Sequence, residues 1–358
     1  MILTKGIRTT AGSKILEKHI PTTDAKVVEL LLKAGGTIVG KTNTHEFACG
    51  ATNTSSIAGP ARNPNDLKRI SGGSSGGSAV AVAAGLVDVA LGTDTAGSVR
   101  TPSALCGVIG FKPTIGAIST IGVIPLSRTF DTVGIISKSF ELIRRTFNTI
   151  MSSRFRVRKT HSRVNPDLRL GSFLFGDYET SLALSSVLRK ISSKYRIQEV
   201  DMDDLRSKGS DVRRTITYAE AAEYHREWFS SRSEDYFPDV RRTLQWGTNV
   251  KAAQYIQSVR FKQELTHEYD RKMRDIDVLL SPTTRVTAPL IDEVIGHEID
   301  FRDQLIGNTE LFNLVGTPSV TIPISRSDKM PIGLMLSGRV GDDDLILTVA
   351  ERIASLLS

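Results

Sequence analysis

The stretch Gly72–Thr114, GGSSGGSAVAVAAGLVDVALGTDTAGSVRTPSALCGVIGFKPT, differs in composition from the rest of the chain and decides the fold class. Residues 71–110 hold nine glycines, about three times the average share for this chain, and only three charged residues. Such a composition is typical of buried backbone that packs closely against other backbone. It predicts, in order, a loop over 71–77, a small-residue helix over 78–85, a strand over 87–91 and a loop over 92–100.

The flanking sequence continues this alternation of helices and strands. Asp24 is placed to cap a helix that Gly35 and Gly36 end, and a short strand is expected over 37–39. Further along, the pattern predicts a long helical region over 140–274, strands over 277–280 and 320–323, and a last helix over 343–357. With no internal repeat and no domain-sized linker, we expect one α/β domain over residues 1–358.

Composition excludes several classes of protein. The chain is 40% apolar and 24% charged, and its longest apolar run, Ala79–Val87, is far short of the ~20 residues that span a membrane. The start at Met1 lacks the pattern of a signal peptide. Two cysteines, Cys49 and Cys106, fit a reducing compartment. We therefore expect a cytoplasmic protein without a membrane partner.

The net charge of +7 belongs to one region of the chain. Residues 141–274 hold 26 Lys and Arg against 18 Asp and Glu, including the run Arg154–Lys159, whereas the remaining residues sum to −1. The run is short, matches no nucleic-acid-binding module and is surrounded by acids. A solvated surface is therefore expected, and nucleic acid is not an expected partner.

The common cofactor motifs are absent. No two glycines are separated by a single residue, which excludes G-x-G-x-x-G, and there is no phosphate-binding G-x-x-x-x-G-K-[ST]. His45 and Glu46 begin like a zinc-protease helix but lack its second histidine, and the other histidines are scattered. We expect no metal and no cofactor.

Serine chemistry remains. Ser74 and Ser75 both fit G-x-S-x-G, the pattern of a nucleophile elbow, and Ser98 follows 24 residues after Ser74 among small residues whose N–H groups could converge on an oxyanion. Asp94 and Arg100, almost alone in an uncharged segment, should be paired if they are buried. The alternative is a Ser/Gly-rich turn with a structural Asp–Arg pair.

This combination resembles the signature segment of the amidase signature family of serine hydrolases. The resemblance covers nearly the whole chain through further blocks in the same order: KTNTHEFACGATNTSSIAGPARNP (41–64), DVLLSPTTRVTAPLI (277–291), NLVGTPSVTIPI (313–324) and PIGLMLSGRVGDDDLIL (331–347). It implies a single α/β domain whose central mixed sheet of many strands is covered by helices on both faces.

The resemblance also implies a Ser-cisSer-Lys mechanism. Ser98 would be the nucleophile, and Ser74, after a cis peptide bond, would pass a proton from Ser98 to a neutral lysine. The backbone N–H groups of four consecutive residues, ending with the nucleophile, would stabilise the tetrahedral oxyanion, and three polar residues would support the site. The oxyanion hole would comprise Thr95, Ala96, Gly97 and Ser98, and the supporting residues would be Ser75, Asp94 and Arg100.

One residue of the implied triad is missing. In the family the lysine precedes the segment that corresponds to Ile2–Ser13, which puts it about two residues before Met1. Lys5 matches a non-catalytic position, and Lys14, Lys41 and Lys112 have no catalytic context. The chain is either read from an internal methionine, with an in-frame Lys-Asp codon pair upstream, or it is a truncated relative. Either way, the 358 residues alone are expected to be inactive.

The resemblance leaves the substrate open. Tyr218–Trp228 resembles a helix of the plain amidases, and there is no clear acidic residue just ahead of Asn313–Gly316, where the glutamine-dependent tRNA amidotransferases have one. We expect a small-molecule amide as substrate, with a homodimer compatible with the family. The alternatives are the glutamine-hydrolysing part of a tRNA-dependent amidotransferase, a catalytically dead binding protein with the same fold, or an α/β-hydrolase that uses Ser74 or Ser75. The last would need a downstream histidine such as His225, His267 or His297.

Overall fold

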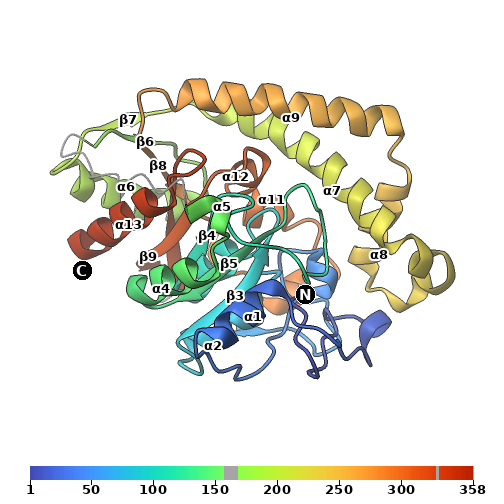
Figure 1. Ribbon diagram of the computed structural model, residues 1–358. Coiled ribbons are helices and arrows are strands. Elements are labelled where there is room, and N and C mark those ends of the chain that lie inside the picture. Colours follow the sequence, from blue (N-terminus) through green and yellow to red (C-terminus); the bar gives the residue numbers. More distant parts are fainter. Residues whose placement is uncertain (157–167, 328–329, 358) are drawn as a thin grey trace.

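A central mixed sheet organises the computed structural model, which describes residues 1–156, 168–327 and 330–357 (Figure 1). Its eight strands lie in the order β3-β5-β4-β9-β10-β8-β6-β7, and all neighbours are antiparallel except β6, which is parallel to both β7 and β8. The strands are β3 (Val89–Asp94), β4 (Ile109–Lys112), β5 (Thr132–Ser137), β6 (Leu170–Ser172), β7 (Ile197–Glu199), β8 (Val278–Pro282), β9 (Ser319–Ser327) and β10 (Met330–Ser337). A separate hairpin pairs β1 (Arg62–Asn63) with β2 (Asp66–Ile70).

Helices cover both faces of the sheet, which confirms the expected α/β class (Figure 1). One face packs against α1 (Lys26–Lys33), α4 (Phe140–Ile150), α6 (Tyr178–Ser192) and α13 (Asp343–Leu357). The other packs against α2 (Gly76–Ala83), α3 (Arg100–Cys106), α7 (Asp203–Arg232), α9 (Ala252–Lys272) and α12 (Glu310–Leu314). The remaining helices are α5 (Ser153–Arg156), α8 (Pro238–Thr248), α10 (Ile291–Val294) and α11 (Arg302–Ile306), with 3₁₀ turns at Lys14–Leu16, Glu46–Ala48 and Ser233–Asp235.

Successive strand residues divide between the two hydrophobic cores, as the pleat requires. Leu280 and Leu334 face the core under α4, α6 and α13, whereas their neighbours Leu279 and Met335 face the core under α7, α9 and α12. All four side chains are at most 1% exposed. A sheet buried on both faces explains why its strands read as continuous apolar runs rather than alternating ones.

The first helix begins differently from the prediction. Its N-cap is Ala25, with no side-chain cap, because the Asp24 carboxylate instead accepts a hydrogen bond from the Lys5 backbone N–H at 2.7 Å. The helix still buries Val27 and Val28 and ends before Gly35, whose φ is +85°.

The strand predicted over 37–39 is wrong. Within the described residues, the backbone of 37–42 has no recorded hydrogen-bond partner, and β3 is the outermost strand on this side of the sheet. Residues 39–42 are exposed, with Val39 at 76%. An apolar stretch becomes a strand only where another strand pairs with it, and none of the described segments forms backbone hydrogen bonds with this one.

The region 140–274 is not wholly helical. It contributes β6 and β7, which extend the far side of the sheet in parallel register. These strands have three residues each, too short for a hydrophobic period to be read from the sequence. The basic run Arg154–Lys159 lies partly outside the described residues.

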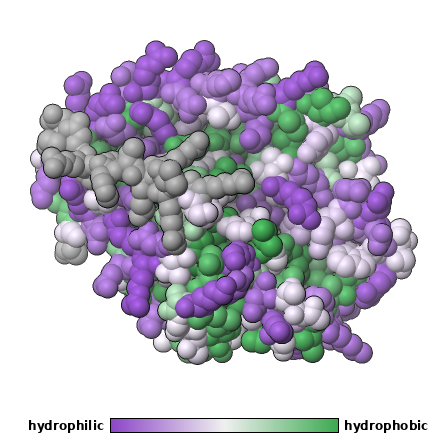
Figure 2. All heavy atoms as spheres, in the orientation of Figure 1, coloured by the Kyte–Doolittle hydropathy of each residue, from purple (hydrophilic) through white to green (hydrophobic). Residues whose placement is uncertain are grey.

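The visible surface is hydrophilic over the long helices and carries apolar patches on the lower half of the view (Figure 2). Within the described part of the chain, every helix is too short or too polar to cross a lipid bilayer.

Candidate active site

Ser74 lies just before α2, in a turn held by several hydrogen bonds. The Gly73–Ser74 peptide bond is cis, as the resemblance implied. The Ser74 carbonyl accepts hydrogen bonds from the His45 N–H (3.0 Å), the Thr44 hydroxyl (3.1 Å) and the Asn53 amide (2.8 Å). The Ser74 side chain is 0% exposed, and its Oγ has no hydrogen-bond partner among the described residues. A buried hydroxyl without a partner is rare in folded proteins and points to a functional position.

The second serine motif lies directly against the first. Ser98 follows β3 and is 6% exposed, and its carbonyl accepts the Ser75 N–H at 3.1 Å. The Ser75 Oγ lies 3.2 Å from both the N and the O of Thr93. The structure therefore brings together two serine motifs that are 24 residues apart in the sequence.

Asp94 shapes the loop that carries Ser98. Its carboxylate accepts the N–H groups of Gly97 (2.8 Å) and Val99 (3.0 Å) and pairs with Arg100 through Nη2 at 2.8 Å and Nε at 3.1 Å. Asp94 and Arg100 are both 0% exposed. Burial by itself raises the pKa of Asp94, but the Arg100 charge and hydrogen bonds outweigh it and lower the pKa to about 2. The expected pairing is confirmed, and Asp94 is ionised at neutral pH.

Two residues that the sequence reasoning did not single out complete this network. Arg100 donates to the Thr309 carbonyl at 2.9 Å and to the Asn313 side-chain oxygen at 2.5 Å, and the Asn313 amide donates back to the Asp94 carboxylate at 2.9 Å. The Thr309 hydroxyl donates to the Ala96 carbonyl at 2.6 Å. Residues 309–313, more than 200 positions from the serine loop, thus clamp it from α12. The only sequence signal was that Asn313 opens one of the family-like blocks.

Three of the four expected oxyanion donors are unengaged. The Gly97 N–H is bonded to Asp94, whereas those of Thr95, Ala96 and Ser98 have no recorded partner among the described residues. The Gly97 φ of +137° turns the loop here. The N–H groups of Thr95, Ala96 and Ser98 therefore remain available as donors, whereas that of Gly97 is already engaged.

Asp131 orients Thr95 within this loop. The Thr95 hydroxyl donates to its carboxylate at 2.5 Å, and the Leu126 and Ser127 N–H groups donate at 2.9 and 3.1 Å. Burial raises the pKa of Asp131 to about 7, because these hydrogen bonds only partly offset the loss of water.

A narrow cavity opens beside Ser98. Its free volume is about 10 Å³, room for one water molecule. Two arginines, Arg213 and Arg302, line it together with Ser98. The rest of the lining comprises Ala48, Gly50, Ala51, Thr95, Ala96, Leu126 and Ile306.

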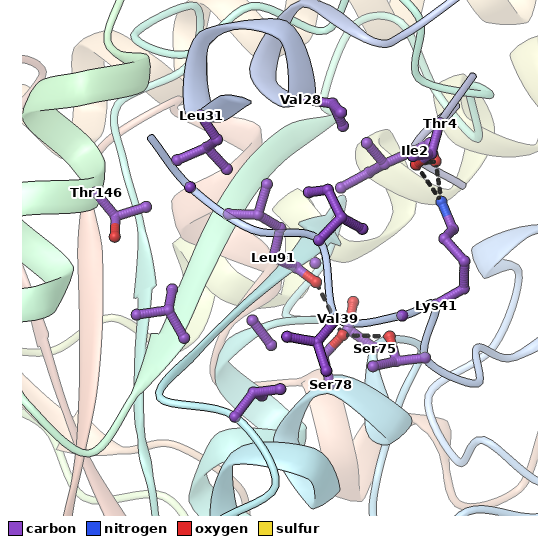
Figure 3. A pocket seen from close by; sticks show the side chains of 18 of the residues that line it. Ile2, Thr4, Val28, Leu31, Val39, Lys41, Ser75, Ser78, Leu91 and Thr146 are labelled. Atoms are coloured by element: carbon purple, nitrogen blue, oxygen red, sulfur yellow. Dashed lines mark hydrogen bonds between the residues drawn. The ribbon is translucent and has the colours of Figure 1, made fainter. Parts of the chain in front are cut away.

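A larger cavity of about 550 Å³ lies beside the outer edge of β3 (Figure 3). Residues 36–44 form one wall and residues 86–93 the other, and Ser78 bridges them by bonding the Thr42 hydroxyl and the Leu91 carbonyl, each at 2.8 Å. The Lys41 ammonium donates to Thr4 and Ile2 at its upper end (Figure 3). Neither Ser74 nor Ser98 lines it, but Ser75 does, so the cavity borders the serine site.

The described lysines do not complete a triad. Burial lowers the pKa of Lys41 to about 8 and that of Lys112 to about 7. The Lys112 ammonium is fully buried but donates to the carbonyls of Pro113 (3.0 Å) and Thr317 (2.6 Å), and no described lysine hydrogen-bonds Ser74. Lys5 and Lys14 are exposed.

The described histidines do not form a Ser-His-Asp arrangement. His225 is buried against the Tyr236 hydroxyl at 3.0 Å, and burial lowers its pKa to about 4. His297 is exposed beside Asp300, and His45 pairs with Asp239 at 2.9 Å. No described histidine lines the cavity beside Ser98, and the described residues contain no cluster that could hold a metal ion.

Comparisons with known proteins identify relatives in both sequence and structure. The family model named Amidase matches residues 1–172 and 180–347. A glutamyl-tRNA(Gln) amidotransferase subunit of Methanospirillum hungatei is 34% identical over 98% of this chain and 89% of its own length. A solved amidase structure superimposes with a TM-score of 0.90 at 30% identity, covering 100% of this chain and 83% of its own. The solved glutamyl-tRNA(Gln) amidotransferase subunit of Thermotoga maritima gives 0.82 at 31%, covering 97% and 79%.

Proposed function

The chain belongs to the amidase family, and on that basis we propose that it hydrolyses carboxylic amides through an acyl-enzyme on Ser98. The observation that carries the proposal is the joining of two serine motifs at one buried point, where the Ser74 Oγ lacks a hydrogen-bond partner among the described residues. A hydroxyl so placed is free to take a proton from one neighbour and give it to another.

The reaction has two steps, acylation of Ser98 and hydrolysis of the resulting ester. The Ser98 oxygen attacks the amide carbon while its proton passes to Ser74, and the N–H groups of Thr95, Ala96 and Ser98 receive the developing oxyanion. The C–N bond then breaks, and the amine leaves with the returned proton. Water attacks the ester in the same way and releases the acid and free Ser98.

The proton acceptor for Ser74 is proposed to be a lysine amine outside these 358 residues. Within the described residues the Ser74 Oγ has no partner, and the amines of Lys41 and Lys112 are bonded elsewhere. We therefore expect little or no amide turnover by the chain alone, and partial rescue of ammonia release by a small added amine such as methylamine.

Labelling with an activated ester tests the nucleophile without needing the lysine. After incubation with p-nitrophenyl butyrate, peptide mass mapping should find the butyryl group on Ser98. Ser98→Ala should reduce labelling and rescued turnover by roughly a thousandfold or more. Ser192→Ala, an exposed serine on α6, is the matched control and should change neither.

The identity of the butyrylated serine also distinguishes between the alternative functions. Butyrylation of Ser74 or Ser75 instead of Ser98 would favour an α/β-hydrolase elbow. An unlabelled chain that releases no ammonia with any added amine would contradict the proposal and favour a non-catalytic binding protein.

Glutamine hydrolysis within an amidotransferase is the second candidate. It is favoured by the 34% identity to the Methanospirillum protein. Against it, no carboxylate lines the described part of the cavity beside Ser98, so the α-ammonium group of glutamine has no acidic partner there.

Among partners, we propose a small-molecule amide and no nucleic acid. Both described cysteines are free and buried, which supports the proposal of a reducing, cytoplasmic location.

A further inference from the structure

The turn at Ser74 rests on the preceding segment 43–55. The Ser74 carbonyl accepts the His45 N–H at 3.0 Å, and the N–H of the glycine before Ser74 donates to the Ala51 carbonyl at 2.6 Å. Ala51 also lines the narrow cavity beside Ser98. The position of the 43–55 segment therefore sets the position of Ser74 and of one part of the cavity wall.

Asp239, in the first turn of α8, anchors this segment. Its Oδ2 lies 2.9 Å from the His45 Nε2, and its Oδ1 accepts the Ser55 hydroxyl at 2.8 Å. All three side chains are buried. The α8 helix lies at the periphery of the molecule, so the contact ties the serine turn to a distant element of the fold (Figure 1).

The Asp239 carboxylate fixes how the His45 ring is held. Burial by itself raises the pKa of Asp239, but the interaction with His45 and the hydrogen bonds from His45 and Ser55 outweigh it and keep the pKa below its ordinary value. An ionised carboxylate only accepts hydrogen bonds, so the His45 Nε2 carries a hydrogen. A Cβ on Gly50 would lie 2.2 Å from Nε2, which means that the ring packs directly against the backbone of the 43–55 segment.

We propose that Asp239 is a positioning residue, which through His45 holds the 43–55 segment, and with it the Ser74 hydroxyl, in the geometry that takes a proton from Ser98. The role rests on the proposed acylation of Ser98. Burying a charged pair costs free energy, and well-packed apolar side chains would often hold two elements together as well or better. Hydrogen bonds to a carboxylate fix direction as well as distance, and direction is what a proton transfer between two hydroxyls needs.

The rate of Ser98 butyrylation by p-nitrophenyl butyrate measures the effect. Asp239→Asn keeps the size of the side chain but turns an NH2 group towards donors of the 43–55 segment, and should slow the maximal rate by roughly 10–100-fold. The ester concentration at half-maximal rate should stay within about twofold of the wild-type value, because Asp239 does not line the cavity. Glu234→Gln removes an exposed acid that pairs with Arg241 of α8 and, as the matched control, should change neither value.

A Ser74→Ala background separates positioning from a merely structural role. There the slowing by Asp239→Asn should fall to less than about twofold, because the hydroxyl through which Asp239 acts is no longer present. Asp239 also stabilises the positive charge of Arg302. A structural defect, or an altered charge balance at Arg302, would slow both backgrounds equally, and that result would overturn the proposal.

Two substitutions of His45 test the hydrogen bond itself. His45→Gln places an amide N–H near the position of Nε2 and should stay within about threefold of the wild-type rate, whereas His45→Leu has no donor and should be as slow as Asp239→Asn. Equal rates for the two His45 variants would overturn the proposal. If Asp239→Asn does not fold, as judged by its thermal transition, this pair of variants decides the question.

Hydrogen exchange measures the geometry of the turn without acylation. The N–H groups of Gly73 and Gly77 are hydrogen-bonded to the 43–55 segment and should exchange at least about tenfold faster in Asp239→Asn than in the wild type or the control variant. Faster exchange in a chain whose Ser98 is never butyrylated would refute the proposed hydrolysis and leave the positioning of the turn. Butyrylation of wild-type Ser98, with rate and exchange unchanged in Asp239→Asn, would refute only the role of Asp239.

Discussion

Asp94 receives hydrogen bonds from the backbone that follows it and from the guanidinium of Arg100. A carboxylate that accepts this many hydrogen bonds fixes the conformation of the loop. The position of the Ser98 side chain therefore does not depend on packing alone. That Asp94 and Arg100 would pair was predictable from the scarcity of charge around them. The clamp by Thr309 and Asn313 was not, because a contact across more than 200 residues leaves no local pattern in one sequence.

Asp131 should make stability depend on pH. Its pKa is raised from 3.8 to about 7, so the folded protein holds a proton that the unfolded chain releases between these values. The free energy of unfolding should therefore fall as pH rises from about 4 to 7, with a slope of up to about 1.4 kcal/mol per pH unit from this group. Asp131→Asn should remove this contribution, as measured by urea unfolding at several pH values.

Glu46 titrates in the same window and supplies the control. Burial raises its pKa to about 7 as well, so Asp131→Asn should reduce the slope without abolishing it. Asp131→Asn together with Glu46→Gln should flatten the slope further. If the slope of Asp131→Asn equals that of the wild type, Asp131 is ionised in the folded state.

Among the elements, those around the serines were the most predictable. The helix expected over 78–85 is α2, and the strand expected over 87–91 is β3, shifted by two or three residues at its ends. Both follow from composition, because small residues and missing charge require burial. The prediction of a strand over 37–39 was wrong because residue propensities do not say whether another strand is available for pairing. Among the described segments, none pairs with the chain between Gly36 and Asn43.

The contact between α7 and α8 should tolerate no added methyl group. A Cβ on Gly247 would lie 2.0 Å from the Tyr218 carbonyl oxygen, which is backbone and cannot rotate away. Gly247→Ala should therefore lower the free energy of unfolding by roughly 1–3 kcal/mol. Urea unfolding measures the change.

Gly209→Ala is the matched control within α7. There the nearest atom is a Leu314 methyl at 3.1 Å, the far end of a side chain that can shift. Because alanine favours a helix by up to about 1 kcal/mol over glycine, this variant should be neutral or stabilising. Equal destabilisation by both substitutions would show that helix packing does not decide the effect at Gly247.

At the scale of the whole molecule, the class and the layers were predictable, but the order of the strands was not. The blocks that resemble the amidase family fall on β3, β4, β8, β9 and β10 and on the loops between them. The neighbours β6 and β7 come from the least family-like part of the chain. They have three residues each, too few for a strand to be predicted from the sequence.

Hydrogen exchange should distinguish the paired strands of the sheet from the unpaired segment near the outer edge of β3. The amides of residues 37–42, which have no recorded partner, should exchange within seconds, whereas those of β5, paired on both sides, should be among the slowest. Exchange followed by mass spectrometry reads both peptides in one experiment. Protection of 37–42 comparable to that of β5 would mean that another segment pairs with it.

The unpaired outer edge of β3 affects how molecules of this protein associate with one another. The opposite edge, β7, is only three residues long and carries Gln198 and Glu199, which discourage pairing between molecules. The six-residue β3 has no such protection: its one charge, Asp94, points into the protein, and the nearby Leu86 and Val39 are 72% and 76% exposed. Among the described residues, the segment 36–44 lies across the cavity from this edge but no strand pairs with it. Concentrated solutions of the chain should therefore self-associate through this edge, and a charged residue at Val89 or Leu91 should keep them monodisperse.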